Sequence, residues 1–145
     1  MPLKKIPLEI SPELLYTLSR MGHGDTIVIA DANFPSDSVA ASCVVTTPIR
    51  IAVKSTAALL RAILELLPVD AYQPNPVKVM DRVAADKARD LHVPAYALLA
   101  EAAGVAETDL GFVERFEFYD VAKRKNFGDL QTYNLTMSVP FVCLW

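Results

Sequence analysis

One histidine of the chain stands in a setting that favours proton transfer. His23 lies between Gly22 and Gly24 in the segment MGHGDTIVIADANFP, residues 21–35. Glycines carry no side chain that could cover an imidazole, and histidine is the side chain that most readily exchanges a proton near neutral pH. His23 is therefore a candidate general acid/base. A loop histidine satisfied by a backbone carbonyl is the alternative reading of the same residues.

An aspartate follows the apolar run of this segment. Residues 26–30, TIVIA, form a continuous apolar and β-branched stretch of strand length, and Asp31 comes directly after it. Ligands of open α/β sheets gather outside the carboxyl ends of strands, which makes Asp31 a candidate binding residue. The alternative is an aspartate that only forms a turn or caps a helix. We expect the glycines to present His23 toward the strand end that carries Asp31.

A second group of polar side chains lies in VERFEFYDVAKRK, residues 113–125. Arg115 and Tyr119 share a face whether the segment is a helix, through i,i+4 spacing, or a strand, through the period of two. Together they offer several donors and one acceptor to a polyhydroxylated ligand. A solvated face with the arginine stacked on a ring is the alternative. Asp70, in LLPVDAY, is a third polar residue at the end of an apolar element.

The elements that must position these residues alternate between helix and strand. Ser11 and Ser55 can cap helices at their first turns, and Gly22 and Gly104 stand where a left-handed residue ends a helix. Pro48 interrupts one strand-like stretch and demotes part of it to an edge or a bulge. The pattern predicts helices over residues 12–21, 56–67 and 94–103, and strands over residues 26–30, 44–51 and 77–80. This alternation favours a layered α/β fold.

Composition narrows the function classes. The 145 residues are 52% hydrophobic, which suits one domain over residues 1–145. A net charge of −3, with 14 basic and 17 acidic residues intermixed, argues against nucleic acid as a partner. Cys43 and Cys143 lack metal-ligand spacing, as do His23 and His92, so we expect free buried thiols, no metal and a reducing compartment. No apolar stretch has the length of a membrane span. We therefore expect a cytoplasmic protein with no membrane partner.

Longer motifs carry a family resemblance. The segment SPELLYTLSRMGHGDTIVIADANFP resembles the N-terminal signature of the RbsD/FucU sugar mutarotases, which comprise L-fucose mutarotase and D-ribose pyranase. The segments LLPVDAY and ERFEFYDVAKRK resemble the L-fucose branch of that family, particularly its animal-type members. The resemblance extends over about residues 8–125. It implies a three-layer α/β/α sandwich, and a homo-oligomer with sites near subunit interfaces, as in the ring-like bacterial relatives.

The resemblance also assigns roles to the candidate residues. The histidine of the family's GHGD motif is the general acid/base, which maps to His23, and the aspartate after the strand binds the sugar, which maps to Asp31. In the L-fucose members, the residues that map to Asp70, Arg115 and Tyr119 also line the site. We therefore expect His23 and Tyr119 to be catalytic, and Asp31, Asp70 and Arg115 to bind the substrate.

The implied reaction is the interconversion of α and β anomers of L-fucose. The hemiacetal ring opens when the anomeric hydroxyl loses a proton and the ring oxygen gains one, so no cofactor is needed and general acid/base catalysis suffices. D-ribose pyranase activity is the alternative within the enzyme class. A non-catalytic sugar-binding or assembly subunit is the alternative outside it.

The C-terminal segment departs from the family from about residue 126. Relatives continue with an apolar strand, a T-G-E turn and a Y-G-N motif that contributes to the sugar site, whereas this chain reads NFGDLQTYNLTMSVPFVCLW. Residues 127–130 or residues 133–135 could each be a displaced form of the Y-G-N motif. Loss of the family's strand would expose backbone donors and acceptors of its neighbours, and the apolar ending VPFVCLW would then favour aggregation unless it docks on the domain.

Overall fold

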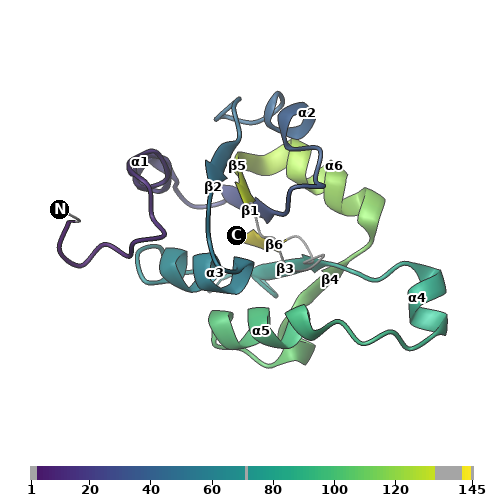
Figure 1. Ribbon diagram of the computed structural model, residues 1–145. Coiled ribbons are helices and arrows are strands. Elements are labelled where there is room, and N and C mark those ends of the chain that lie inside the picture. The colour runs from purple at the N-terminus through teal and green to yellow at the C-terminus, as the bar shows by residue number, and fades with distance from the viewer. Residues whose placement is uncertain (1–2, 71, 133–141, 145) are drawn as a thin grey trace.

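The computed structural model describes residues 3–70, 72–132 and 142–144, in which helices and strands alternate along most of the chain (Figure 1). The helices are α1 (Pro12–Arg20), α2 (Ser36–Ala40), α3 (Thr56–Leu64), α4 (Ala84–Ala88), α5 (Pro94–Ala103) and α6 (Arg115–Lys125), with a 3-10 turn at Glu107–Asp109. The strands are β1 (Thr26–Ala30), β2 (Ile49–Ile51), β3 (Val77–Met80), β4 (Gly111–Val113), β5 (Asn126–Thr132) and β6 (Val142–Leu144). No helix among these residues is long and apolar enough to cross a membrane.

The strands form one six-stranded sheet in the order β2-β5-β1-β6-β3-β4. β5 runs parallel to both β1 and β2, and β3 runs parallel to β4. β6 pairs antiparallel with β1 on one side and with β3 on the other, so β1 and β3 point in the same direction. All the strands of the described sheet except β6 therefore share one direction, and their amino ends lie along one edge.

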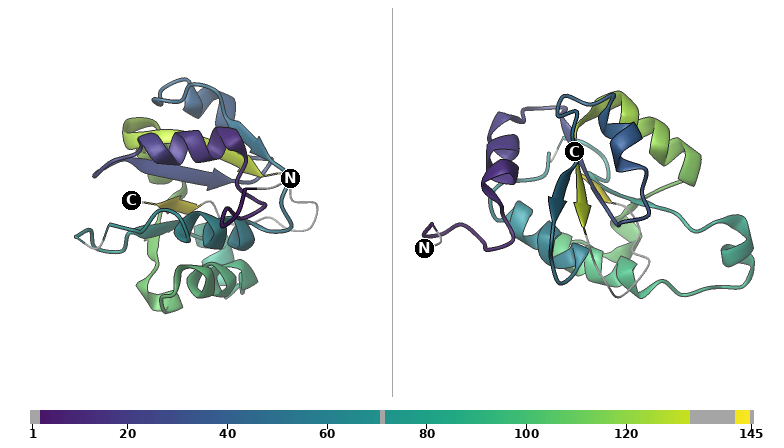
Figure 2. Two further views of the ribbon diagram at one scale, coloured as in Figure 1. Left: turned by 90° about the vertical axis from the view of Figure 1, so that its left-hand side faces the viewer. Right: turned by 45° about the horizontal axis from the view of Figure 1, so that its top comes forward.

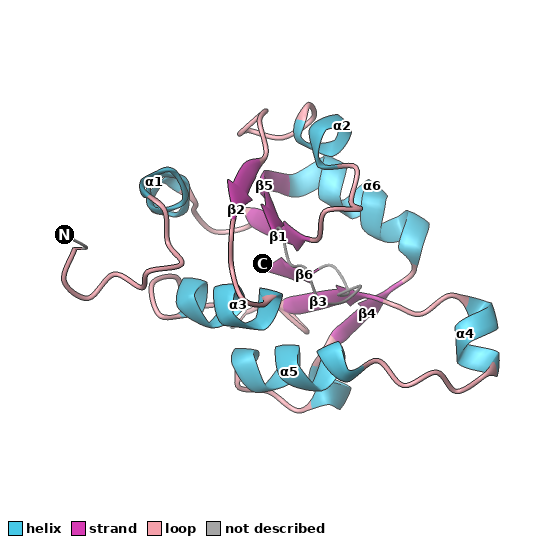
Figure 3. Ribbon diagram, in the orientation of Figure 1, coloured by secondary structure: helices cyan, strands magenta, loops and turns pink. Residues whose placement is uncertain are grey.

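Helices cover both faces of this sheet, which confirms the predicted three-layer α/β/α sandwich (Figure 3). Ile27 and Ile29 of β1 belong to a buried cluster with α1, α3 and α5, whereas Val28 and Ala30 belong to one with α2 and α6. Since neighbouring side chains of a strand point to opposite faces, the unbroken apolar run of β1 is what a strand with a core on each side requires.

The predicted helix ends are partly confirmed. The hydroxyls of Ser11 and Ser55 accept hydrogen bonds from the N–H groups of Leu14 and Ala58, each at 3.1 Å, and so cap α1 and α3. Gly104 ends α5 in the left-handed region, with φ of 71°. The same prediction for Gly22 is wrong, because α1 ends at Arg20, the capping residue Met21 is extended, and Gly22 does not have a positive φ.

Two strand predictions are also resolved. Of the stretch 44–51, only Ile49–Ile51 after Pro48 is a strand, and it lies at an edge of the sheet, where a nearby proline breaks no central pairing. The segment 113–125 was compatible with a helix or a strand and is helical from Arg115 onward. Arg115 and Tyr119 therefore share a face through helical spacing.

A hydrogen bond joins α5 to the carboxyl end of β3. The Tyr96 hydroxyl donates to the carbonyl oxygen of Met80 at 2.8 Å. Burial, together with the negative charge of Asp81, raises the pKa of Tyr96 to about 12. The phenol therefore keeps its proton, and the hydrogen bond, throughout the physiological pH range.

The divergent C-terminal segment supplies two central strands. β5 lies between β2 and β1, and β6 lies between β1 and β3. Residues 142–144 of the apolar ending thus dock in the sheet, where they pair with the backbone of β1 and β3. Residues 127–130 lie within β5, and residues 133–135 lie outside the described residues.

The segment that carries α4 extends away from the rest of the chain, as Figure 1 and the right-hand view of Figure 2 show. No residue of α4 is buried. His92 follows α4 and is also exposed. Cys43, in the buried cluster with α2 and α6, is a free thiol as expected and donates to the Val39 carbonyl at 3.3 Å.

Candidate active site

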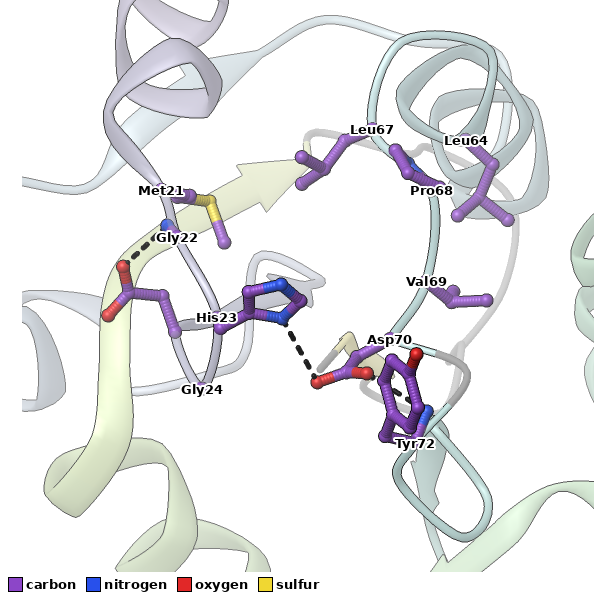
Figure 4. A pocket seen from close by; sticks show the side chains of 11 residues that line it. Met21, Gly22, His23, Gly24, Leu64, Leu67, Pro68, Val69, Asp70 and Tyr72 are labelled. Carbon is purple, nitrogen blue, oxygen red and sulfur yellow. Dashed lines mark hydrogen bonds and ion pairs between the residues drawn. The ribbon is translucent and has the colours of Figure 1, made fainter.

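His23 and Asp70 face each other across a cleft at the amino edge of the sheet (Figure 4). The cleft has a volume of about 400 Å³. His23 Nδ1 lies 3.6 Å from Asp70 Oδ2, and the side chains are 88% and 14% exposed. Apolar side chains from the end of α3 onward form much of the remaining wall, namely Leu64, Leu67, Pro68 and Val69. An exposed imidazole beside a sheltered carboxylate can exchange protons with a small polar molecule in this cleft.

A tight turn places His23 at the mouth of the cleft. The Asp25 N–H donates to the Gly22 carbonyl at 3.1 Å, which closes a turn over residues 22–25. The Gly22 N–H donates back to Asp25 Oδ2 at 2.8 Å, and Gly24 has φ of 83°. A type II turn needs a positive φ at its third residue, so Gly24, rather than Gly22, is the glycine that the backbone requires.

This turn makes a testable distinction between its glycines. Gly24→Ala is expected to lower the free energy of unfolding by about 1–2 kcal/mol, because a side chain in the left-handed region meets its own backbone. Gly22→Ala is the matched control: its added carbon would lie 3.9 Å from Asp25 Oδ2, an ordinary contact, so no loss is expected. Urea unfolding of both variants measures the difference. Equal stabilities would contradict the turn as described.

Asp70 is held in place by its own loop. The Tyr72 N–H donates to Asp70 Oδ1 at 2.9 Å, and the Gln73 N–H donates to the Asp70 carbonyl at 3.2 Å. The Tyr72 side chain also lines the cleft and is 91% exposed. The sequence reasoning did not single out Tyr72, although its place two residues after Asp70 within LLPVDAY was the signal that could have identified it.

The other three candidate residues gather at the carboxyl edge of the sheet. Asp31 is 7% exposed and accepts hydrogen bonds from the Asn33 N–H at 2.8 Å and from Asn33 Nδ2 at 3.3 Å. Arg115 Nε donates to the Tyr119 hydroxyl at 3.3 Å. The ring of Phe34 links the two groups, because its centre lies 5.6 Å from that of Tyr119. Phe34 was not among the predicted residues, although the NFP motif contains it.

The structure does not bring His23 and Asp31 together within one chain. His23 precedes β1 and Asp31 follows it, and a five-residue strand at about 3.3 Å per residue separates them by roughly 17 Å. The expectation that His23 points toward the strand end carrying Asp31 is therefore wrong. Asp70 precedes β3 and so joins His23 at the amino edge, whereas Arg115 and Tyr119 follow β4 and so join Asp31.

The donor chemistry of both groups suits hydroxyl groups. The amino-edge group offers an imidazole and a carboxylate, and the carboxyl-edge group offers a carboxylate, a guanidinium and a phenol. Among the residues that the structure describes, no three histidine, cysteine, aspartate or glutamate side chains lie close enough to hold a metal ion. Groups of this kind can bind a polyol and move its protons.

Comparisons with known proteins give a uniform result. A family model described as the RbsD / FucU transport protein family matches residues 4–136. The fucose mutarotase of Homo sapiens is 45% identical over 127 residues, which cover 84% of this chain and 79% of that protein. The structure of FucU from Bifidobacterium longum superposes with a TM-score of 0.79 at 31% identity, covering 96% of this chain and 94% of that one.

A third relative was solved with a sugar. The fucose mutarotase from Streptococcus pneumoniae, in complex with L-fucose, superposes with a TM-score of 0.72 at 33% identity. The match covers 98% of this chain and 96% of that one. The likeness therefore spans both edges of the sheet, where the two groups of candidate residues lie.

Proposed function

We propose that this chain, which belongs to the RbsD/FucU family, interconverts the α and β anomers of L-fucose. The observation that carries the proposal is the exposed His23 imidazole facing Asp70 in a cleft of about 400 Å³. A volume of this size lies in the range of roughly 300–1,000 Å³ that is typical of small-molecule sites. The choice of L-fucose as the substrate is supported by the fucose mutarotases among the relatives.

The residues can perform ring opening without a cofactor. His23 takes the proton of the anomeric hydroxyl as the bond between the anomeric carbon and the ring oxygen breaks, and the ring oxygen receives a proton from Tyr119 or from water. The open aldehyde then rotates about its carbon–carbon bond. Return of the two protons closes the ring in either configuration. Asp31 and Arg115 hold hydroxyl groups during these steps, and their charges make those hydrogen bonds strong.

The two groups meet, in this proposal, only between subunits. Within one chain, β1 lies between His23 and the carboxyl-edge residues, so a single sugar cannot contact both groups. A homo-oligomer in which the amino edge of one subunit faces the carboxyl edge of the next places all five residues around one ligand. Such a head-to-tail contact closes into a ring when the rotation between subunits allows it.

Mixed oligomers test this arrangement. At fucose concentrations below the wild-type KM, His23→Ala and Arg115→Ala proteins are each expected to show little activity. Oligomers dissociated and reassembled from equal amounts of both should regain about one quarter of the wild-type activity. Each shared site takes its His23 from one subunit and its Arg115 from the next, and each of the two is native in half of the sites. Both are therefore native in about one site in four. His23→Ala protein that is dissociated and reassembled with itself is the control and should stay inactive. No recovery in the test mixture would argue for sites within single chains.

Anomer exchange measured by NMR tests the reaction itself. Magnetisation exchange between the α and β signals of L-fucose should accelerate when the protein is added, with a smaller effect on D-ribose. Saturation-transfer signals report binding in the same samples. Fucose that binds while its anomers exchange no faster than in buffer would identify a non-catalytic sugar-binding subunit instead.

We further propose that all 145 residues form one domain of this family, with the divergent segment from about residue 126 completing the sheet. The buried Cys43 thiol suits a reducing compartment, and the cytoplasm is the location that we propose.

A further inference from the structure

The orientation of the His23 ring depends on one neighbour. Among the described residues, Asp70 is the partner that the His23 side chain has for any polar contact, and 88% of that side chain is exposed. A side chain that packs against so little surface loses its rotamer freedom only through such a contact. The position of Asp70 therefore decides which imidazole nitrogen faces the protein and which faces the cleft.

Asp70 presents one particular oxygen to the ring. Its Oδ1 accepts the Tyr72 N–H at 2.9 Å, so the carboxylate cannot rotate without losing that bond. Oδ2 then faces His23 Nδ1 at 3.6 Å, as the dashed line of Figure 4 marks. This distance exceeds a hydrogen bond, so in the structure the carboxylate and the ring form an electrostatic contact. A fixed carboxylate oxygen beside Nδ1 favours a proton on that nitrogen.

We propose that Asp70 is a positioning residue that holds His23 in the Nδ1–H tautomer. The proton on Nδ1 then points to Asp70, and Nε2, across the ring, keeps its lone pair for the anomeric hydroxyl. Only an unprotonated nitrogen can accept that proton, so the tautomer decides whether the base faces the sugar. The catalytic consequence rests on the proposed function, whereas the tautomer is a property of the free protein.

This role differs from that of a residue that only holds a sugar hydroxyl. Loss of a sugar contact raises KM and leaves the imidazole of the unliganded protein unchanged. Loss of a positioning contact changes the tautomer before any sugar is present and lowers kcat. Asp70 can contact the substrate as well, but a tautomer measured without sugar reports the positioning role alone.

Nitrogen-15 NMR of histidine-labelled protein without sugar, at a pH where the rings are neutral, tests the inference. His23 is expected to be mainly Nδ1–H. In Asp70→Asn, the amide oxygen stays on the Tyr72 N–H and the NH₂ group faces His23, so Nδ1 becomes an acceptor and the proton moves to Nε2. We expect this reversal together with a fall in kcat of about 10²-fold for L-fucose and little change in KM.

Two controls accompany the variant. Asp25→Asn removes a charge from the turn that carries His23 but keeps an oxygen for the Gly22 N–H, so the His23 tautomer should not change. The exposed His92 serves as an internal reference in every spectrum.

The outcomes separate this inference from the proposed function. A wild-type His23 that is mainly Nε2–H, or a tautomer that is the same in Asp70→Asn, would overturn the positioning role even if fucose exchange is fast. If the tautomer reverses in Asp70→Asn but the wild-type protein does not accelerate fucose exchange, the positioning geometry is supported and the proposed function is refuted.

Discussion

His23→Ala is expected to return the exchange of L-fucose anomers to the rate measured in buffer. General acid/base catalysis contributes roughly 10²- to 10⁴-fold, and His23 is the candidate group at the cleft that can act as a base near neutral pH. The loss should appear in kcat, because a methyl group leaves the cleft open and its other walls in place. Magnetisation exchange at several fucose concentrations separates kcat from KM.

The His23→Ala substitution is not expected to destabilise the fold. The His23 side chain is 88% exposed, so its removal takes little apolar surface out of the core. His92→Ala is the matched control, since His92 is also exposed and lies in the segment of α4, away from the cleft. A His23→Ala protein that keeps wild-type exchange rates would refute His23 as the proton-transfer group and, with it, the proposed mechanism.

Removal of residues 142–145 is expected to unfold the protein at room temperature. Val142–Leu144 pair with β1 on one side and with β3 on the other, so their loss separates the strands β2, β5 and β1 from β3 and β4. Each buried backbone group left without a partner costs about 1–3 kcal/mol. A few such groups on the buried strands equal the roughly 5–15 kcal/mol by which a domain of this size is stable.

Circular dichroism and urea unfolding measure this effect. Deletion of residues 1–4 is the control of equal length, because Leu3 and Lys4 are exposed and the first helix begins only at Pro12. The control should keep the unfolding midpoint of the full chain. A chain without residues 142–145 that also keeps this midpoint would show that the sheet does not depend on β6.

Much of the fold follows from local rules. Ser11 and Ser55 cap helices because a hydroxyl satisfies an N–H group at the first turn wherever the rest of the chain lies. The apolar run of β1 likewise predicts a strand between two layers, since both of its faces must be buried. Gly22 was assigned the wrong conformation because two glycines flank His23, and the Asp25 contacts that select Gly24 cannot be ranked from residue types alone.

The sequence by itself also determined which residue types were available for chemistry, together with a family resemblance that the comparisons confirm. Only the tertiary structure decided how these residues are grouped. Because β1 and β3 run in the same direction, the residues that precede them, His23 and Asp70, lie at the amino edge of the sheet. Asp31 follows β1 and lies at the carboxyl edge, so His23 contacts Asp70 and not Asp31. The pairing partners of β6 also depend on the tertiary structure, because a three-residue strand carries too little sequence pattern to specify its neighbours. β6 lies between β1 and β3 and pairs with the backbone groups of both.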